Sequence, residues 1–276
     1  MDRVWFITGA GRGLGKAYAD EALSHGDKVA ATGRNIDKII AAFGENENVF
    51  PVELDVSKPE QAMEAVKLAV EHFGRIDVLV NNAGYGLFGA LEEVSDAETR
   101  ALFDTCVFGL LNVTRAVLPI MRAQHSGKII NVSSKAGLVG DPGDVVYNAA
   151  KFAVTGASEG MREELSDWGI DVICLCPAPH RTDFKDASSR KEPKHLMHEY
   201  DGRLGHRAPE LTRMGNHQQP NDPKKTAAHV YEVSCLDVMP SKLIMGEELY
   251  HEYEEKIADN LSEMLKYRHI SMDTKF

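Results

Sequence analysis

The chain has 276 residues, a formal net charge of −11 and a pI near 5.5. This acidic balance argues against a surface that binds nucleic acid or an anionic membrane, because either would repel the chain at long range. There is no apolar run of about eighteen residues and no charged-then-apolar leader. We therefore expect a cytoplasmic protein without a membrane span; the charge leaves small neutral or cationic partners possible.

The four cysteines do not have the Cys-x-x-Cys spacing of zinc or redox sites, and the eleven histidines are scattered. Cys174 and Cys176 alternate in a predicted strand, so they point to one face and are expected in the core. We expect no metal site.

The first predicted strand, 4–7, leads into a glycine-rich turn and then into a helical pattern over 16–25. Glycines at such a turn let the backbone approach a pyrophosphate, which the helix N-terminus attracts through its free N–H groups and dipole. The spacing is Gly-x-x-x-Gly-x-Gly, not the commoner Gly-x-Gly-x-x-Gly. The candidate nucleotide contacts are Gly9, Arg12, Gly13, Leu14 and Gly15.

Predicted strands and helices then alternate along the chain. The strand-like runs are 28–32, 49–54, 76–80, 128–132, 171–176 and 242–245, and helical patterns follow at 223–235 and 247–266. Right-handed crossovers between parallel strands place helices on both faces of the sheet. Although the length would also fit two small domains, we predict a single α/β domain over 1–276 with a doubly wound, Rossmann-like parallel sheet of about seven strands.

Residues 185–223 interrupt this alternation with charges, histidines and prolines. A connection of that length suggests a lid or binding loop over the active face. A disordered surface insertion is the alternative for its middle part.

The end of the second strand indicates which nucleotide binds. An NAD-binding fold usually has an acidic residue there for the adenosine ribose, whereas this chain has Gly33, Arg34 and Asn35. Arg34 and Arg12 are suited to bidentate contact with a 2'-phosphate. The sequence therefore favours NADP(H) as the cofactor.

Tyr147 and Lys151 lie four residues apart in a predicted helix, so their side chains share one face. An ammonium near a phenol favours phenolate, so we expect Lys151 to lower the pKa of Tyr147 toward neutral pH, where the tyrosine acts as general acid or base. Ser134 ends an apolar strand and offers a hydroxyl to a substrate oxygen. A Tyr–Lys pair on a solvated helix face is the alternative, and the serine and the nucleotide turn argue against it.

Together these residues resemble the short-chain dehydrogenase/reductase family in its single-domain form. The resemblance covers the turn 8–15, Asp55-Val56, the stretch 74–84, Ser134, 147–151 and 181–184. It implies that Asp55 and Val56 hold the adenine and that Asn82, Ala83, Gly84 and Pro177 line the cofactor. It further implies that Tyr147 is the general acid, that Lys151 bonds the nicotinamide ribose, and that Thr182 contacts the carboxamide.

The chain departs from the family pattern at two positions. Cys106 stands where the family usually has an asparagine that completes a proton relay, and Ala178 replaces the glycine of a usual Pro-Gly pair. The first change weakens the relay, and the second places a methyl group where the nicotinamide would approach.

The sequence therefore predicts an NADPH-dependent reductase of ketones or aldehydes, reversible to alcohol oxidation. The alternative is an NADP(H)-binding regulatory or interaction protein with little turnover. The candidate substrate residues are Tyr85, Phe88, Leu138, Val139, Pro142, Pro179, His180 and Phe184, some of which are equally suited to the core. By resemblance, helices over 97–124 and 147–168 would pair with other subunits in a homodimer or homotetramer.

Overall fold

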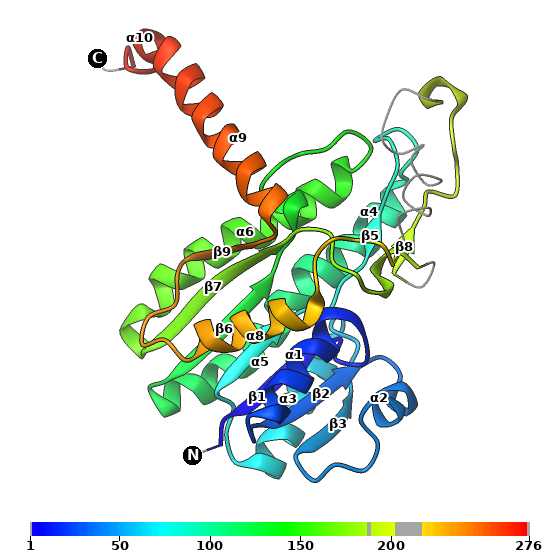
Figure 1. Cartoon of the computed structure of the whole chain (residues 1–276), viewed down its shortest axis with the longest axis vertical. Coiled ribbons are helices and arrows are strands. Elements are labelled where there is room, and N and C mark those ends of the chain that lie inside the picture. Colours follow the sequence, from blue (N-terminus) through cyan, green and yellow to red (C-terminus); the bar gives the residue numbers. More distant parts are fainter. Residues whose placement is uncertain (1, 187–188, 202–216, 275–276) are drawn as a thin grey trace.

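The computed structural model describes residues 2–186, 189–201 and 217–274. A sheet with the strand order β3-β2-β1-β4-β6-β7-β9 runs through the molecule, and every neighbouring pair is parallel (Figure 1). Its strands are β1 (Val4–Thr8), β2 (Lys28–Gly33), β3 (Val49–Glu53), β4 (Val78–Asn81), β6 (Gly127–Val132), β7 (Ile170–Pro177) and β9 (Lys242–Met245). The predicted seven-stranded, doubly wound fold is confirmed.

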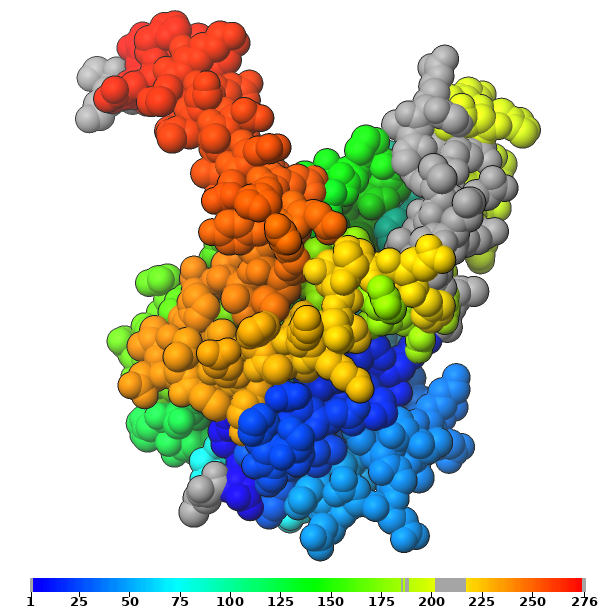
Figure 2. All heavy atoms as spheres, viewed as in Figure 1, coloured from blue at the N-terminus to red at the C-terminus, as the bar shows by residue number. Residues whose placement is uncertain are grey.

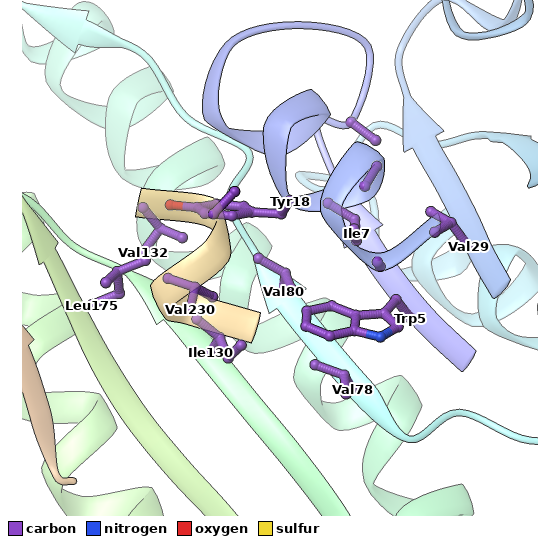
Figure 3. Packing of buried hydrophobic residues seen from close by; sticks show 14 of the residues in the cluster. Trp5, Ile7, Tyr18, Val29, Val78, Val80, Ile130, Val132, Leu175 and Val230 are labelled. Carbon is purple, nitrogen blue, oxygen red and sulfur yellow. The ribbon is translucent and has the colours of Figure 1, made fainter. Parts of the chain in front are cut away.

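Helices cover both faces of this sheet, which explains why the central strands are mostly apolar and buried. The helices are α1 (Gly13–Ser24), α2 (Ile36–Phe43), α3 (Pro59–Phe73), α5 (Gly109–Gln124), α6 (Val145–Leu165) and α8 (Pro223–Ser234). Helices α1 and α8 pack together on one face, and α3, α5 and α6 pack on the other. Figure 3 shows Tyr18 of α1 and Val230 of α8 over the strand residues Val80 and Ile130.

The helix predicted over 97–124 is interrupted. It consists of α4 (Asp96–Phe103), a π-helical turn η1 (Asp104–Phe108) and α5. By length and composition alone, Asp96–Gln124 could cross a membrane. It packs on the sheet instead, with Val113 and Val117 fully buried in the core beside α3. The π turn contains Cys106 and brings it to the active face.

Two short strands were not predicted. β5 (Gly86–Leu87) and β8 (Arg190–Lys191) pair in parallel and form a second, two-stranded sheet. Two residues are too few to show a periodic pattern. The segment predicted as a lid over 185–223 thus contains β8 and the short helical turn η5 (His198–Tyr200), whereas its residues 187–188 and 202–216 lie outside the described residues.

The last long helix, α9 (Glu247–Lys266), projects from the body and leads to α10 (Arg268–Ser271) (Figures 1 and 2). Its base is attached: Leu249 is buried, Glu252 pairs with Lys135 at 2.9 Å, and the Nζ of Lys256 donates to the carbonyl oxygen of Leu138 at 2.5 Å. Every residue from 257 to 271 is exposed.

Candidate active site

A cavity of about 880 Å³ lies at the carboxyl ends of the parallel strands, the edge where α/β sheets bind ligands. It brings together nearly all of the predicted site. Its lining includes Gly9, Arg12, Gly13, Leu14, Arg34, Asp55, Val56, Asn82, Ala83, Gly84, Ser134, Tyr147, Lys151, Pro177 and Thr182.

Gly15 is the predicted nucleotide contact that does not line the cavity. A Cβ at this position would lie 2.3 Å from the carbonyl oxygen of Gly9 and 2.5 Å from the Nδ2 of Asn82. The residue is therefore a glycine because α1 packs closely on the turn. Gly9 and Gly13, in contrast, line the cavity with φ of 67° and 57°, a backbone conformation that favours glycine.

Side-chain hydrogen bonds join the glycine turn to the end of β4. The backbone N–H groups of Asn82 and Ala83 donate to the Oγ1 of Thr8, each at 2.9 Å. The Nδ2 of Asn82 donates to the carbonyl oxygen of Thr8 at 2.9 Å. These bonds hold two cavity-lining segments, distant in sequence, in one fixed arrangement.

Ser134 follows β6 and begins the short helical turn η2 (Lys135–Gly137), where its hydroxyl accepts from the N–H of Ala136 at 3.2 Å. The turn packs tightly on α6, because a Cβ on Gly137 would lie 2.7 Å from the carbonyl oxygen of Lys151 and 2.9 Å from the Oγ1 of Thr155. Thr155 of α6 donates to the Gly137 carbonyl oxygen at 3.1 Å. The serine therefore stands on a turn fixed directly to the helix that carries Tyr147.

Tyr147 is buried, with 5 % of its surface exposed. Burial raises the pKa of its phenol above the ordinary value, and the nearby Ser134 side chain lowers it by a smaller amount. The expected lowering of this pKa by Lys151 is therefore wrong in this structure. The physical reason is that burial disfavours phenolate more strongly than the neighbouring groups favour it.

Lys151 is buried beside Tyr147, and its Nζ donates to the carbonyl oxygen of Val132 at 2.9 Å. Burial lowers the pKa of this ammonium below its ordinary value. Serine, tyrosine and lysine thus line one cavity, as predicted, with the lysine bonded to the end of β6.

Known proteins share this fold. The family described as short chain dehydrogenase matches residues 3–193. The chain is 39 % identical over 276 residues to oxidoreductase BOA17 of Botryotinia fuckeliana, covering 99 % of both chains. A short-chain dehydrogenase structure from Streptomyces avermitilis superposes with a TM-score of 0.90 at 31 % identity, covering 100 % of both chains.

This chain belongs to the short-chain dehydrogenase/reductase family. It is an oxidoreductase of the type that acts on CH–OH or C=O groups. Two other neighbours carry nicotinamide nucleotides. A short-chain dehydrogenase/reductase from Burkholderia phymatum in complex with NAD has a TM-score of 0.81 at 27 % identity, covering 95 % of both chains. ElxO with NADP bound has a TM-score of 0.72 at 28 % identity, covering 89 % of this chain and 96 % of the other.

Cys106, the first departure from the short-chain dehydrogenase/reductase pattern, is buried in the π turn. Its thiol contacts the carbonyl oxygen of Tyr85 at 3.8 Å. A Cβ built on Gly84 would lie 3.3 Å from its Sγ and 3.9 Å from the Nζ of Lys151. The thiol therefore stands beside the lysine.

Ala178, the second departure, lines the cavity and is buried, and its N–H donates to the carbonyl oxygen of Met245 at 2.8 Å. Its methyl group packs closely on the turn after β9, because a Cβ on Gly246 would lie 2.6 Å from it. The methyl group of Ala178 fits because its neighbour Gly246, with φ of 127°, has no side chain.

The predicted substrate residues separate into two groups. Those that line the cavity are Tyr85, Phe88, Pro142, Pro179, His180 and Phe184. Leu138 and Val139 are outside it: Leu138 is buried in a cluster with Cys176 and Leu249, and Val139 packs against that cluster, so their prediction as substrate residues is wrong. Leu138 does not face the cavity because it packs against Leu249 at the base of α9.

His180 lines the cavity, but other groups already contact both of its ring nitrogens. Its Nδ1 lies 2.7 Å from the carbonyl oxygen of Ala178 and its Nε2 lies 2.6 Å from the Oγ1 of Thr226. Burial lowers the pKa of the imidazole. The residue fixes the chain after β7 to the start of α8, so a substrate would meet only the sides of its ring.

Sequence reasoning missed several charged residues of the cavity. Lys38 lies near Arg34 at the nucleotide end, and Lys135, Asp141, Asp144, Arg190 and Lys191 lie at the catalytic end. The Arg190 guanidinium lies 4.6 Å from the ring of Phe88, which lies 5.6 Å from the ring of Tyr147. The position of Asp144 three residues before Tyr147 could have indicated its location, whereas nothing in the sequence placed Arg190.

Proposed function

We propose that this protein is an NADP(H)-dependent reductase that converts a ketone or aldehyde to an alcohol, reversibly. The observation that carries the proposal is that Ser134, Tyr147 and Lys151 line one cavity together with the glycine turn. Burial keeps the Tyr147 phenol protonated, which suits a group that donates a proton to the carbonyl oxygen during reduction. The Ser134 hydroxyl holds the same oxygen.

The cavity fits a dinucleotide. Its glycine turn has positive φ at Gly9 and Gly13, and the N-terminus of α1 lies behind it with free N–H groups for a pyrophosphate. The turn, Asp55, Val56 and the segment 82–84 would hold the dinucleotide, and Lys151 would hold the nicotinamide ribose. Bound NADPH would supply the hydride.

The charges at the adenosine end favour NADP(H) over NAD(H). Arg12, Arg34 and Lys38 line that end of the cavity, and no acidic side chain occupies the position after β2. Asn35 instead caps α2, accepting from the N–H of Lys38 at 3.0 Å. A 2'-phosphate would gain charge-assisted hydrogen bonds here.

The test measures NADPH oxidation with a panel of ketones and aldehydes, and NADPH binding by fluorescence. We expect turnover that Tyr147→Phe abolishes, with NADPH affinity changed by only a few-fold, because the substitution removes only the transferable proton. Tyr250→Phe is the matched control, because Tyr250 is exposed on α9. NADPH binding without turnover of any carbonyl compound would support the regulatory alternative instead.

The proposal includes a homodimer or homotetramer. Phe152 of α6, Phe108 of η1 and Trp168 after α6 are exposed by 42 %, 52 % and 44 %, on or next to the helices that the resemblance assigns to subunit contacts. Light scattering of the wild type and of Phe152→Asp tests this assembly. A monomeric wild type would refute it.

A further inference from the structure

Asp144 stands at the N-cap position of α6, three residues before Tyr147 and seven before Lys151. This spacing places the three side chains along one side of the first turns. All three line the same cavity. The helix thus presents a carboxyl group to the cavity next to the phenol and the ammonium.

Within the described part of the chain, the carboxyl group of Asp144 makes no hydrogen bond or ion pair that would stabilise the fold. Aspartate is a favoured N-cap residue, yet this side chain makes no capping hydrogen bond. Among the residues that the structure describes, none forms a hydrogen bond or an ion pair with it. Burial and the nearby Asp141 raise its pKa to about 7. This half-buried carboxyl lines the cavity, where a ligand that supplies a donor could bind it.

The charged groups near Asp144 are Asp141 of the preceding loop, which raises its pKa, and Arg190 and Lys135, which lower it. Lys135 of η2 is paired with Asp141 at 3.3 Å and with Glu252 at 2.9 Å. Arg190 of β8 lies 3.7 Å from Glu192 and packs on the ring of Phe88. Both cations therefore have carboxylates other than Asp144 beside them.

We propose that the substrate carries a protonated amino group close to its reacting carbon and that Asp144 binds this group. The inference rests on the proposed function, and it makes the substrate an amino ketone, with the amino alcohol as its product. An ammonium donates hydrogen bonds and also neutralises a carboxylate, which a hydroxyl cannot do. The net charge of −11 favours the approach of a cation.

Asp144 takes no part in the transfer itself. The carbonyl carbon accepts a hydride and the carbonyl oxygen accepts the proton of Tyr147, so the C=O double bond becomes a CH–OH group. The ammonium remains charged throughout. Asp144 is therefore a specificity residue, and its substitution should change the preference between substrates.

The experiment compares α-aminoacetophenone with its N-acetyl derivative, which has the same ketone and no charge. With NADPH, we expect the wild type to prefer the free amine in kcat/KM by about tenfold or more, the range of a charge-assisted hydrogen bond. Asp144→Asn should reduce this ratio to near one, mainly through KM, and Asp144→Glu should restore part of it. Asp167→Asn, an exposed control, should keep the ratio and the activity.

The pH dependence of the same ratio is the second readout. In the wild type the ratio should rise toward neutral pH, as Asp144 loses its proton, and should fall again at higher pH, where the α-amino ketone loses its own charge; in Asp144→Asn the rise should be absent. Protonation of Tyr147 affects the reduction of both ketones equally, so it cancels in the ratio of their kcat/KM values.

The possible results separate the inference from the function on which it rests. Equal reduction of both ketones, or preference for the keto acid benzoylformate, overturns the assignment of Asp144 and leaves the reductase intact. Reduction of none of these compounds, with Tyr147→Phe indistinguishable from the wild type, overturns both. Melting curves of each variant establish that it is folded, and Asp144→Ser replaces Asp144→Asn if that variant is not.

Discussion

The Nζ of Lys151 lies 5.8 Å from the centroid of the Tyr147 ring and donates a hydrogen bond to the Val132 carbonyl oxygen, 2.9 Å away. The ammonium is thus bonded to the sheet while it stays near the phenol. Because burial lowers the pKa of Lys151, holding this charge costs folding free energy.

We expect Lys151→Met to lose both turnover and NADPH affinity, yet to melt at an equal or higher temperature than the wild type. The methionine fills a similar volume without a buried charge. Because the pKa of Lys151 is lowered in the folded state, the wild type becomes more stable as pH rises toward the ordinary lysine pKa. The difference in melting temperature between Lys151→Met and the wild type should therefore shrink as pH rises. Exposed Lys67→Met is the control. Unchanged NADPH affinity would contradict a contact between Lys151 and the cofactor.

Arg34→Ala should weaken the preference for NADPH over NADH. One charge-assisted contact to the 2'-phosphate contributes about 1.5 to 3 kcal/mol, which is about 10-fold to 150-fold in the affinity ratio. Affinities for both nucleotides are measured by fluorescence, with Arg100→Ala on the exposed surface of α4 as control. If the wild type binds NADH as tightly as NADPH, the assignment of Arg12 and Arg34 is wrong.

Cys106→Asn should raise the turnover number and leave the Michaelis constant for NADPH nearly unchanged. A thiol is a weak hydrogen-bond partner, so an amide beside Lys151 should improve the water-mediated proton path and act only on the proton-transfer step. The control is Cys235→Asn, which alters an exposed cysteine. A lower melting temperature without a gain in rate would instead identify Cys106 as a core residue, at a cost of about 1 to 3 kcal/mol for unpaired amide atoms.

Gly15→Ala should destabilise the protein by about 1 to 3 kcal/mol, because its methyl group would meet the Gly9 carbonyl and the Asn82 amide. Gly160→Ala is the matched control: it lies in α6 with open space around its Cβ, so alanine should stabilise by about 0.5 to 1 kcal/mol. Chemical denaturation of both variants tests the pair. Equal stability of the two would refute the packing role of Gly15.

Asp144→Asn should stabilise the protein at pH 8 but not at pH 4.5. The pKa of Asp144 is about 7 in the folded state, above its ordinary value near 4, so the folded state binds the extra proton between these values. Wild-type stability therefore falls as pH rises from about 4 to 7, and the variant lacks this loss. Melting temperatures at both pH values, with Asp167→Asn as a control, measure the difference. A difference that does not change with pH would exclude the raised pKa.

The sheet could be predicted from the sequence because its central strands are short apolar runs between helical patterns. The strand β1, for example, is buried at every position. The site could be predicted for a related reason: Thr8, Ser134 and Tyr147 each follow or face a strand end, and parallel strands end at one edge of the sheet.

Features that depend on three-dimensional packing could not be predicted. The two-residue strand β8 places Arg190 on Phe88 through a pairing with β5 that no periodicity reveals. Leu138 belongs to the core because α9, far along the chain, covers it. The raised pKa of Tyr147 depends on burial, which the sequence spacing of Tyr147 and Lys151 does not contain.

The attachment of α9 has a mechanical consequence. A helix of its length extends about 30 Å, and its base is bonded to Lys135 and to the Leu138 carbonyl, on either side of the turn that follows Ser134. Its outer part is exposed and forms a lever arm attached at its base to the segment that follows Ser134. A displacement of its far end would reach Ser134 through this segment, as well as β9 through the contact of Tyr253 with Lys242.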